Sequence, residues 1–148
     1  MRESRTFMLH IDTPQGRQCV PAAHVHDEWE AQQGALLVPM MATSVRIVLN
    51  GQVLEGCADD TEYALKRLAE QLPEGCTLRC CLTCRHGHFC PVGDQDNELF
   101  CVTDFEPKQK ADLYHVTEDE QERASRSRTL FGICEGWEAQ SDEYYTYK

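Results

Sequence analysis

The chain has 148 residues, of which 41% are hydrophobic, and a formal net charge of −11 from 25 acidic and 14 basic residues. This length supports one hydrophobic core, and no linker or repeat divides it, so we expect a single domain over residues 1–148. An acidic surface repels phosphate groups, which argues against nucleic-acid binding. The one basic cluster, Arg123, Arg126 and Arg128, alternates with acidic residues and is interpreted as a solvated helix face.

The apolar segments and the cysteine count bear on the compartment. No secretory signal is visible, and no apolar run approaches the length that crosses a membrane. We therefore expect a cytoplasmic protein without membrane contact, in which thiols stay reduced. The nine cysteines are an odd number and cannot all pair within the chain, so a disulfide framework is the minor alternative.

The first third of the chain predicts strands. Residues 7–12 alternate in polarity, a Pro-Gln-Gly turn follows, and residues 17–22 can return as the partner strand. Residues 23–42 mix charged, aromatic and apolar residues around Pro39, and they indicate no clear element. Residues 43–54 predict a hairpin, because apolar alternation surrounds an Asn50-Gly51 turn.

Helix signals follow. Asp59 with Glu62 suits a helix N-terminus, and leucines at helical spacing continue the pattern to residue 72. A second, polar helix is predicted from Thr117, paired with Glu120 in a capping box, to about Leu130.

The remaining segments predict short strands. Residues 76–85 alternate in polarity and predict a half-buried strand, and residues 99–102 predict a shorter one. Residues 133–137 and 144–147 suit a last strand or an ordered tail. The fold class expected from all these elements is α+β, a single domain with antiparallel β-hairpins, two helices and a zinc-knuckle-like cysteine cluster.

The cysteine cluster carries most of the chemical information. Six cysteines lie within residues 76–101, and they are Cys76, Cys80, Cys81, Cys84, Cys90 and Cys101. The Cys-x2-Cys spacing of Cys81 and Cys84 can supply two zinc ligands from one turn, provided that the strand breaks between them. We therefore predict that residues 76–101 form a metal-binding segment. The pattern resembles zinc ribbons and knuckles, which implies only a local structural element.

Two further ligands must come from elsewhere in the fold. We favour Cys101 and Cys134, because each follows a short apolar run that can anchor it. Cys90 remains a close alternative, and His86 or His88 can replace a thiolate. The predicted site is therefore Cys81, Cys84, Cys101 and Cys134 around Zn²⁺, with Arg79 and Arg85 placed to offset its negative charge.

The other cysteines are assigned to the core, and several alternative chemistries are less favoured than the zinc site. Cys19, Cys57, Cys76 and Cys80 are interpreted as core residues. Inert reduced thiols, an iron–sulfur cluster, or a redox pair of Cys81 and Cys84 remain alternatives. A redox pair needs a helix after its first cysteine, and the sequence predicts none there. A nucleophilic cysteine beside His86 or His88 lacks an orienting acid.

Two other groups of residues have the composition of a binding site or a contact surface. His24 and His26, with the acidic residues that follow, could hold a second metal, but a solvated turn is favoured. Aromatic residues could form a contact surface or cover the edge of the core, and they are Trp29, Trp137, Tyr144, Tyr145 and Tyr147.

Together these observations predict a small, acidic, cytoplasmic protein with a structural zinc site. An interaction or accessory role is favoured over an enzyme, with a basic or polar protein as partner and the terminal aromatic residues as the contact. The alternative is a thiol-based redox or iron–sulfur protein that uses Cys81, Cys84 and Cys90. The sequence names neither the partner nor the oligomeric state.

Overall fold

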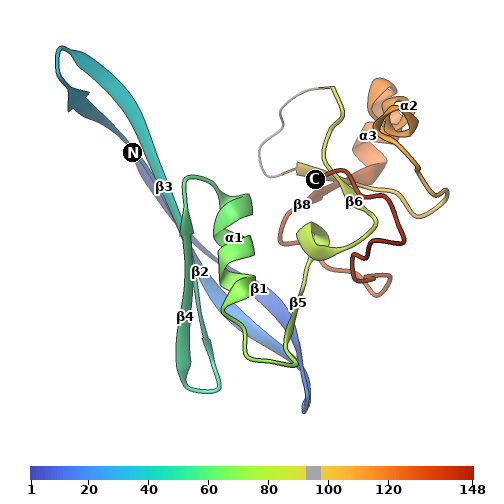
Figure 1. Ribbon diagram of the computed structural model, residues 1–148, viewed down its shortest axis with the longest axis horizontal. Coiled ribbons are helices and arrows are strands. Elements are labelled where there is room, and N and C mark those ends of the chain that lie inside the picture. Colours follow the sequence, from blue (N-terminus) through green and yellow to red (C-terminus); the bar gives the residue numbers. More distant parts are fainter. Residues whose placement is uncertain (93–97) are drawn as a thin grey trace. The chain divides into compact units, whose positions relative to one another are not determined.

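The computed structural model describes residues 1–92 and 98–148 (Figure 1). The chain forms two compact units, Met1–Leu78 and Arg79–Lys148, which we call unit 1 and unit 2 and describe separately. Of the predicted metal-binding segment 76–101, residues 93–97 lie outside the described part. The α+β class is confirmed, since antiparallel strands and helices both occur. The expectation of a single domain and the zinc-knuckle-like character of the cluster stay predictions.

Unit 1 is a sheet with the strand order β4-β3-β2-β1-β5, in which β1 to β4 pair antiparallel with their neighbours. The strands are β1 (Arg2–Thr13), β2 (Gly16–Gln33), β3 (Leu36–Leu49), β4 (Gln52–Ala58) and the short β5 (Thr77–Arg79). The predicted strands at 7–12 and 17–22 are present but longer. The Asn50-Gly51 turn is also confirmed, with positive φ at both residues, as this type of hairpin turn requires.

The segment 23–42, which the sequence left unassigned, forms the far half of a long hairpin. Pairing with β1 ends at Asp27, and pairing of β3 with β4 ends at Thr43. Beyond these points β2 and β3 continue as a two-stranded ribbon, residues 28–42, seen in Figure 1 as the hairpin that runs on past β4. Because β3 is an edge strand in this ribbon, it tolerates Pro39.

The helix α1 (Thr61–Glu70) covers one face of the sheet of unit 1. Its N-cap is Asp60, one residue later than predicted, and the Asp60 carboxylate accepts a hydrogen bond from the Tyr63 N–H at 2.8 Å. The predicted apolar stripe is confirmed by the burial of Leu65 and Leu68. The helix packs directly on Gly56 of β4, where an added Cβ would come within 1.9 Å of the Ala64 carbonyl oxygen.

Unit 2 has much shorter elements. Its sheet has the order β6-β7-β8, with β6 (Gly87–His88), β7 (Glu98–Cys101) and β8 (Ser127–Thr129). The predicted strand at 99–102 is thus confirmed within one residue. The predicted strand at 76–85 is wrong beyond Arg79, because the chain turns into the 3-10 helix η1 (Cys81–Thr83). This turn is the break between Cys81 and Cys84 that shared ligation requires.

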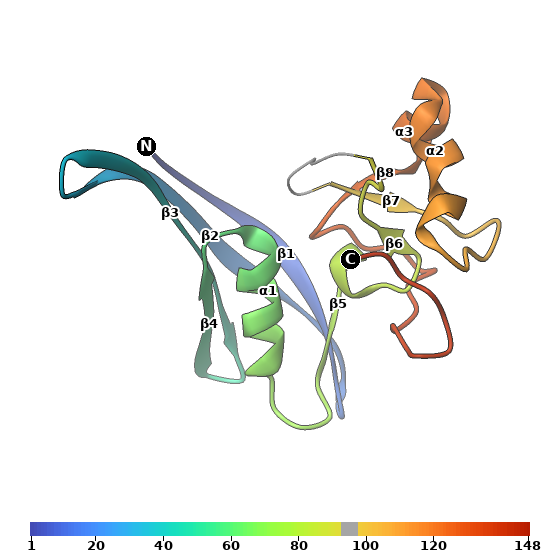
Figure 2. The ribbon, with the colours of Figure 1, turned by 45° about the horizontal axis from the view of Figure 1, so that its top comes forward.

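The predicted helix from Thr117 to Leu130 is divided in the structure. A 3-10 turn η2 (Lys110–Leu113) leads into α2 (Tyr114–Glu118), and α3 (Glu120–Arg126) follows (Figure 2). Asp119 breaks the helix, because its extended backbone and its carboxylate cap α3 through the N–H groups of Gln121 and Glu122. Thr117 lies inside α2 and is buried, so the predicted capping box is wrong.

The C-terminal segment is an ordered tail, and no strand is formed by residues 133–137 or 144–147. Figure 2 shows this segment passing the η1 turn, and the Phe89 N–H donates to the Tyr147 carbonyl oxygen at 2.8 Å. Tyr145 and Tyr147 pack on a small core of Val102, Leu113 and Val116. These aromatic residues therefore cover the core of unit 2, which was the alternative to a contact surface.

Candidate metal centre

Cys81 and Cys84 lie at the two ends of the tight η1 turn. The Cys84 N–H closes the turn by donating to the Cys81 carbonyl oxygen at 3.3 Å. Thr83 holds it from the other side, because its hydroxyl oxygen accepts a hydrogen bond from the Cys80 N–H at 3.1 Å. A turn of this kind allows two cysteines with this spacing to share one metal ion.

The segment that carries Cys134 packs on the same turn. The Cys81 N–H donates to the Gly132 carbonyl oxygen at 2.7 Å, and the Leu82 N–H donates to that of Leu130 at 3.1 Å. Gly132 leaves room for the Cys81 sulfur, since a Cβ at Gly132 would come within 2.9 Å of Cys81 Sγ. The Cys81 sulfur therefore lies against backbone only two residues before Cys134.

Gly87 connects Cys101 with the η1 turn. Gly87 of β6 pairs with Cys101 of β7, and the Gly87 N–H donates to the Cys84 carbonyl oxygen at 3.2 Å. A Cβ at Gly87 would come within 2.5 Å of the Cys81 carbonyl oxygen, so a side chain cannot fit there without displacing the turn. The structure thus gathers the three segments that carry the four predicted ligands.

The four thiols also affect one another electrostatically. Burial first, and then the neighbouring thiols of Cys80, Cys84, Cys101 and Cys134, raise the pKa of Cys81 to about 12. Burial is likewise the main cause that raises the pKa of Cys101. The thiolate forms are therefore unfavourable without a compensating cation, and a divalent metal ion would supply that compensation.

The Lys148 ammonium lies against the carbonyl side of the η1 turn. It donates hydrogen bonds to the carbonyl oxygens of Cys81, Leu82 and Cys84 at 3.3, 2.5 and 2.7 Å. It also lowers the pKa of the buried thiol of Cys80, although burial outweighs this effect and the pKa of Cys80 is raised overall. Sequence reasoning missed Lys148, because nothing in its local pattern connects it with the turn.

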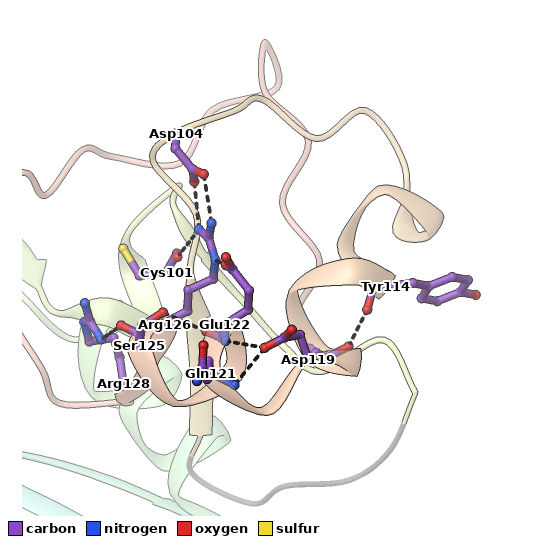
Figure 3. Close-up of polar contacts among 10 residues, drawn as sticks. Cys101, Asp104, Tyr114, Asp119, Gln121, Glu122, Ser125, Arg126 and Arg128 are labelled. Atoms are coloured by element: carbon purple, nitrogen blue, oxygen red, sulfur yellow. Dashed lines mark hydrogen bonds and ion pairs between the residues drawn. The ribbon is translucent and has the colours of Figure 1, made fainter.

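Arg126 fixes the backbone at Cys101. Figure 3 shows its guanidinium donating to the Cys101 carbonyl oxygen at 3.2 Å and to both carboxylate oxygens of Asp104 at 2.7 and 2.8 Å. The hydrogen bond from Arg126 is the main cause that lowers the pKa of Asp104 to about 2. Glu122, one turn earlier in α3, accepts from Arg126 Nε at 2.9 Å. The Arg126 side chain is 15% exposed and ties α3 to the backbone at Cys101, so its assignment to a solvated helix face is wrong.

The two arginines predicted to offset the charge of the site have other contacts. The Arg85 guanidinium pairs with Glu138 at 3.1 Å and stacks on the Tyr144 ring at 3.3 Å from its centroid. The Arg79 guanidinium lies over the Trp137 ring. Instead, Arg128 and Arg126 both lower the pKa of Cys101 against the dominant effect of burial.

The alternative ligands are placed as follows. His86 Nδ1 contacts the Val102 carbonyl oxygen at 3.2 Å, and its Nε2 lies 3.3 Å from the Glu138 carboxylate. His88 is buried, and its Nδ1 accepts a hydrogen bond from the Tyr147 N–H at 3.1 Å. Burial, with Lys148 and His86, lowers the pKa of His88 to about 4. Cys90, the alternative thiolate ligand, is buried.

The remaining cysteines divide by exposure. All nine are free thiols. Cys80 is buried as predicted and Cys76 is half-buried, but Cys19 and Cys57 are exposed, so their assignment to the core is wrong. Both lie on the face of the unit 1 sheet opposite α1, because they alternate with buried residues of β2 and β4.

His24 and His26 lie on β2 rather than in a turn. His24 Nε2 contacts the Thr61 hydroxyl at 2.9 Å, and Arg5 Nε donates to its Nδ1 at 3.3 Å. His26 Nδ1 contacts the Thr43 hydroxyl at 2.7 Å, and its Nε2 lies 3.0 Å from the Glu28 carboxylate. Because each histidine has two polar neighbours within unit 1, both have structural roles that need no metal.

The donor set at the η1 turn fits zinc in its chemistry. The four sulfurs supply the thiolate ligands that structural zinc sites use, and Gly132 leaves room beside the Cys81 sulfur. Within residues 1–92 and 98–148, no three His, Cys, Asp or Glu side chains are already placed to hold a metal ion. Binding would therefore require side-chain rearrangement around backbone that is already gathered.

Comparisons with known proteins give no relative: no protein-family description, curated protein or solved structure matches this chain. Among the described residues, no helix combines the length and the apolar character needed to cross a membrane.

Proposed function

We propose that unit 2 is organised by a structural zinc ion bound to the thiolates of Cys81, Cys84, Cys101 and Cys134. We further propose that the protein is a small cytoplasmic interaction or accessory protein rather than an enzyme, with a basic or polar protein as its partner. The nine free thiols suit a reducing compartment, and the net charge of −11 favours a basic partner over a phosphate-bearing one.

The observation that carries the zinc proposal is the position of Gly132 and Gly87 around the η1 turn. Both glycines approach Cys81 so closely that a Cβ would collide with it, and they connect the turn to the segments of Cys134 and Cys101. In a unit with such short strands, few backbone hydrogen bonds between strands hold these segments together, beside the apolar packing of residues such as Leu82 and Leu99. Zinc ligation would supply that link, and in small domains it contributes directly to folding.

The test is the metal content and coordination of protein purified without chelator. We expect one zinc per chain, with X-ray absorption showing sulfur neighbours only, at about 2.3 Å. A mixed shell of nitrogen and sulfur would show that His86 or His88 is a ligand and that the four-cysteine set is wrong. Substoichiometric zinc, together with stability that a strong chelator does not change, would refute the zinc site itself.

The alternative is a redox or iron–sulfur protein that uses Cys81, Cys84 and Cys90. The high pKa of Cys81 disfavours a reactive thiolate, and the turn is followed by β6 rather than by the helix that lowers thiol pKa in redox motifs. Insulin reduction with a thiol donor tests this alternative. Activity in the unaltered protein that is lost in Cys81→Ser would replace the structural role with a redox one, and a brown protein would indicate iron and sulfur.

A further inference from the structure

The ribbon of residues 28–42 has one face that continues the α1-covered face of the sheet. Side chains alternate along strands, so Glu28 and Glu30 of β2 share this face with the buried His24. His24 lies nearer the base of the ribbon, where the ribbon joins the rest of the sheet. From β3, the residues opposite them are Met41 and Pro39. We call this surface the acidic face of the ribbon, which also includes Leu37 opposite Gln32.

Carboxylates gather where this face meets the start of α1. The Thr43 hydroxyl donates to the Asp59 carbonyl oxygen at 3.2 Å, which ties the base of the ribbon to the helix N-terminus. Asp59 and the N-cap Asp60 are both exposed there, close to the strand that leads to Glu28 and Glu30. No Lys or Arg occurs between Arg17 and Arg46, so the ribbon itself has no basic side chain to balance these groups.

Basic neighbours of the acidic face come from other segments and are few. Arg5 of β1 lies toward the base of the ribbon and donates to His24, and the N-terminal ammonium of Met1 donates to the Glu28 carbonyl oxygen at 2.5 Å. His26 contacts one Glu28 oxygen, but the Glu28 side chain remains 51% exposed. Much of the carboxylate surface therefore remains available to a partner.

The same face exposes apolar side chains where α1 no longer covers it. Leu37 is 66% exposed and Met41 is 46% exposed. Methionine adapts its shape to different partners and is frequent at surfaces that bind amphipathic segments. A row of apolar side chains beside carboxylates matches a helix that has one apolar face and flanking Lys or Arg residues.

We propose that the acidic face binds a basic amphipathic helix of a partner protein, which would lie on the ribbon beyond the N-terminus of α1. The inference rests on the interaction role proposed above, but it is independent of the zinc site in unit 2. Charge complementarity selects this occupant. A second copy of the chain, at −11, would bring further carboxylates to this face, and an anionic lipid or nucleic acid would be repelled.

The opposite face of the ribbon provides a matched control. Trp29 and Met40 pair across the strands there, and they are 46% and 36% exposed. Their neighbours on this face, Ala31 and Val38, are also uncharged. A basic helix would gain no ion pairs on this side.

The test is a titration of the full chain with a fluorescent helical peptide of Leu and Lys in amphipathic order, with a Leu and Glu peptide as the charge control. We expect the Lys peptide to bind and the Glu peptide not to bind. Glu28→Gln with Glu30→Gln, and separately Leu37→Ser with Met41→Ser, should each weaken binding about tenfold. Trp29→Ser with Met40→Ser should change it by less than about twofold.

A second pair of variants separates a local site from general attraction. Glu70→Gln with Glu74→Gln removes the same charge from exposed positions at the far end of α1 and beyond, and binding should be retained. An equal loss in this variant, or a loss confined to Trp29→Ser with Met40→Ser, would overturn the acidic face as the site. Absence of peptide binding by the unaltered chain would overturn the interaction role as well, whereas binding that survives every variant would overturn this inference alone. Zinc content and circular dichroism of each variant confirm that the fold is intact.

Discussion

The strands of unit 1 reach 18 residues and pair along most of their length, whereas the longest strand of unit 2 within its described residues has four. Unit 1 buries a continuous set of aliphatic side chains between its sheet and α1. Unit 2 also buries apolar side chains, such as Leu99 and Phe100, but its short elements are joined in addition by side chains that bind distant carbonyl groups. Trp137 donates to Cys80, Gln140 to Leu82 and Lys148 to the η1 turn.

This difference indicates two sources of order in one chain. A sheet covered by a helix is stabilised by apolar burial, which needs no added group. Short strands share few backbone hydrogen bonds, so the irregular segments that join them depend more on specific cross-links, of which a metal ion is the strongest candidate here. The two units should therefore respond differently to the same treatment.

Metal removal should give the largest contrast. A strong chelator should unfold unit 2 and leave unit 1 folded, because structural zinc contributes on the order of 10 kcal/mol to small zinc domains. Each unit contains one tryptophan, so Trp29→Phe leaves Trp137 as the reporter of unit 2. We expect its emission to shift to the red on chelation, while amide hydrogen exchange in β1 and α1 stays slow. Simultaneous loss of protection in both units would contradict their independence.

Replacement of single cysteines should give the next largest effect. Cys81→Ser or Cys84→Ser should abolish zinc binding and destabilise unit 2 by about 4 kcal/mol or more. Cys90→Ala should cost only about 1 to 2 kcal/mol, the loss of a buried sulfur, and should retain the metal. Cys19→Ser in unit 1 is the exposed control. Zinc loss in the Cys90 variant would show that Cys90 is a ligand and that the choice of Cys134 is wrong.

Gly56→Ala should affect unit 1 alone. The new Cβ would lie 1.9 Å from the Ala64 carbonyl oxygen and 2.6 Å from the Leu68 nitrogen, so α1 must move off the sheet. We expect a loss of about 3 kcal/mol, at the upper end for overpacking, with zinc content unchanged. Urea denaturation followed by α1 amide exchange measures it. Gly136→Ala is the matched control in unit 2, because its Cβ would meet only Cys134 Sγ, at an ordinary 3.7 Å.

The sequence predicted the local parts of this structure better than the distant ones. The Asn50-Gly51 hairpin and α1 follow from adjacent residues, and both are present. The segment 23–42 could not be assigned from the sequence, because a two-stranded ribbon has no single buried face that would make polar and apolar residues alternate. Asp119 was missed as a helix break because Thr117 and Glu120 offered a competing capping pattern, which the burial of Thr117 excludes.

The candidate site shows the same limit. The spacing of Cys81 and Cys84 predicted a turn, and the turn exists as η1. Which distant cysteines accompany it depends on tertiary contacts through Gly87 and Gly132, which no local pattern encodes. The contact between Lys148 and the turn could not be predicted either, because 64 residues separate Lys148 from Cys84.

The smallest predicted effect is a pH dependence that belongs to unit 1. Burial, and then the positive charge of Arg5 and the neighbouring His26, lower the pKa of His24 from its ordinary value of 6.5, while Glu3 opposes them. The folded state therefore favours neutral His24, and the unfolded state binds more protons just below pH 6.5. This stabilisation is complete above pH 6.5 and is lost as the pH falls through the interval below it.

Urea denaturation at neutral pH and at about pH 5.5, followed by amide exchange of α1, should show unit 1 weakening in acid. His24→Gln can keep a donor toward Thr61 and an acceptor for Arg5 but cannot be protonated, so this variant should lose most of the pH dependence. His88 in unit 2 also has a lowered pKa. Amide exchange of α1 is therefore needed, because a signal from the whole chain would combine the effects of His24 and His88. If His24→Gln keeps the full acid sensitivity of unit 1, the sensitivity arises from other groups and the assignment to His24 is wrong.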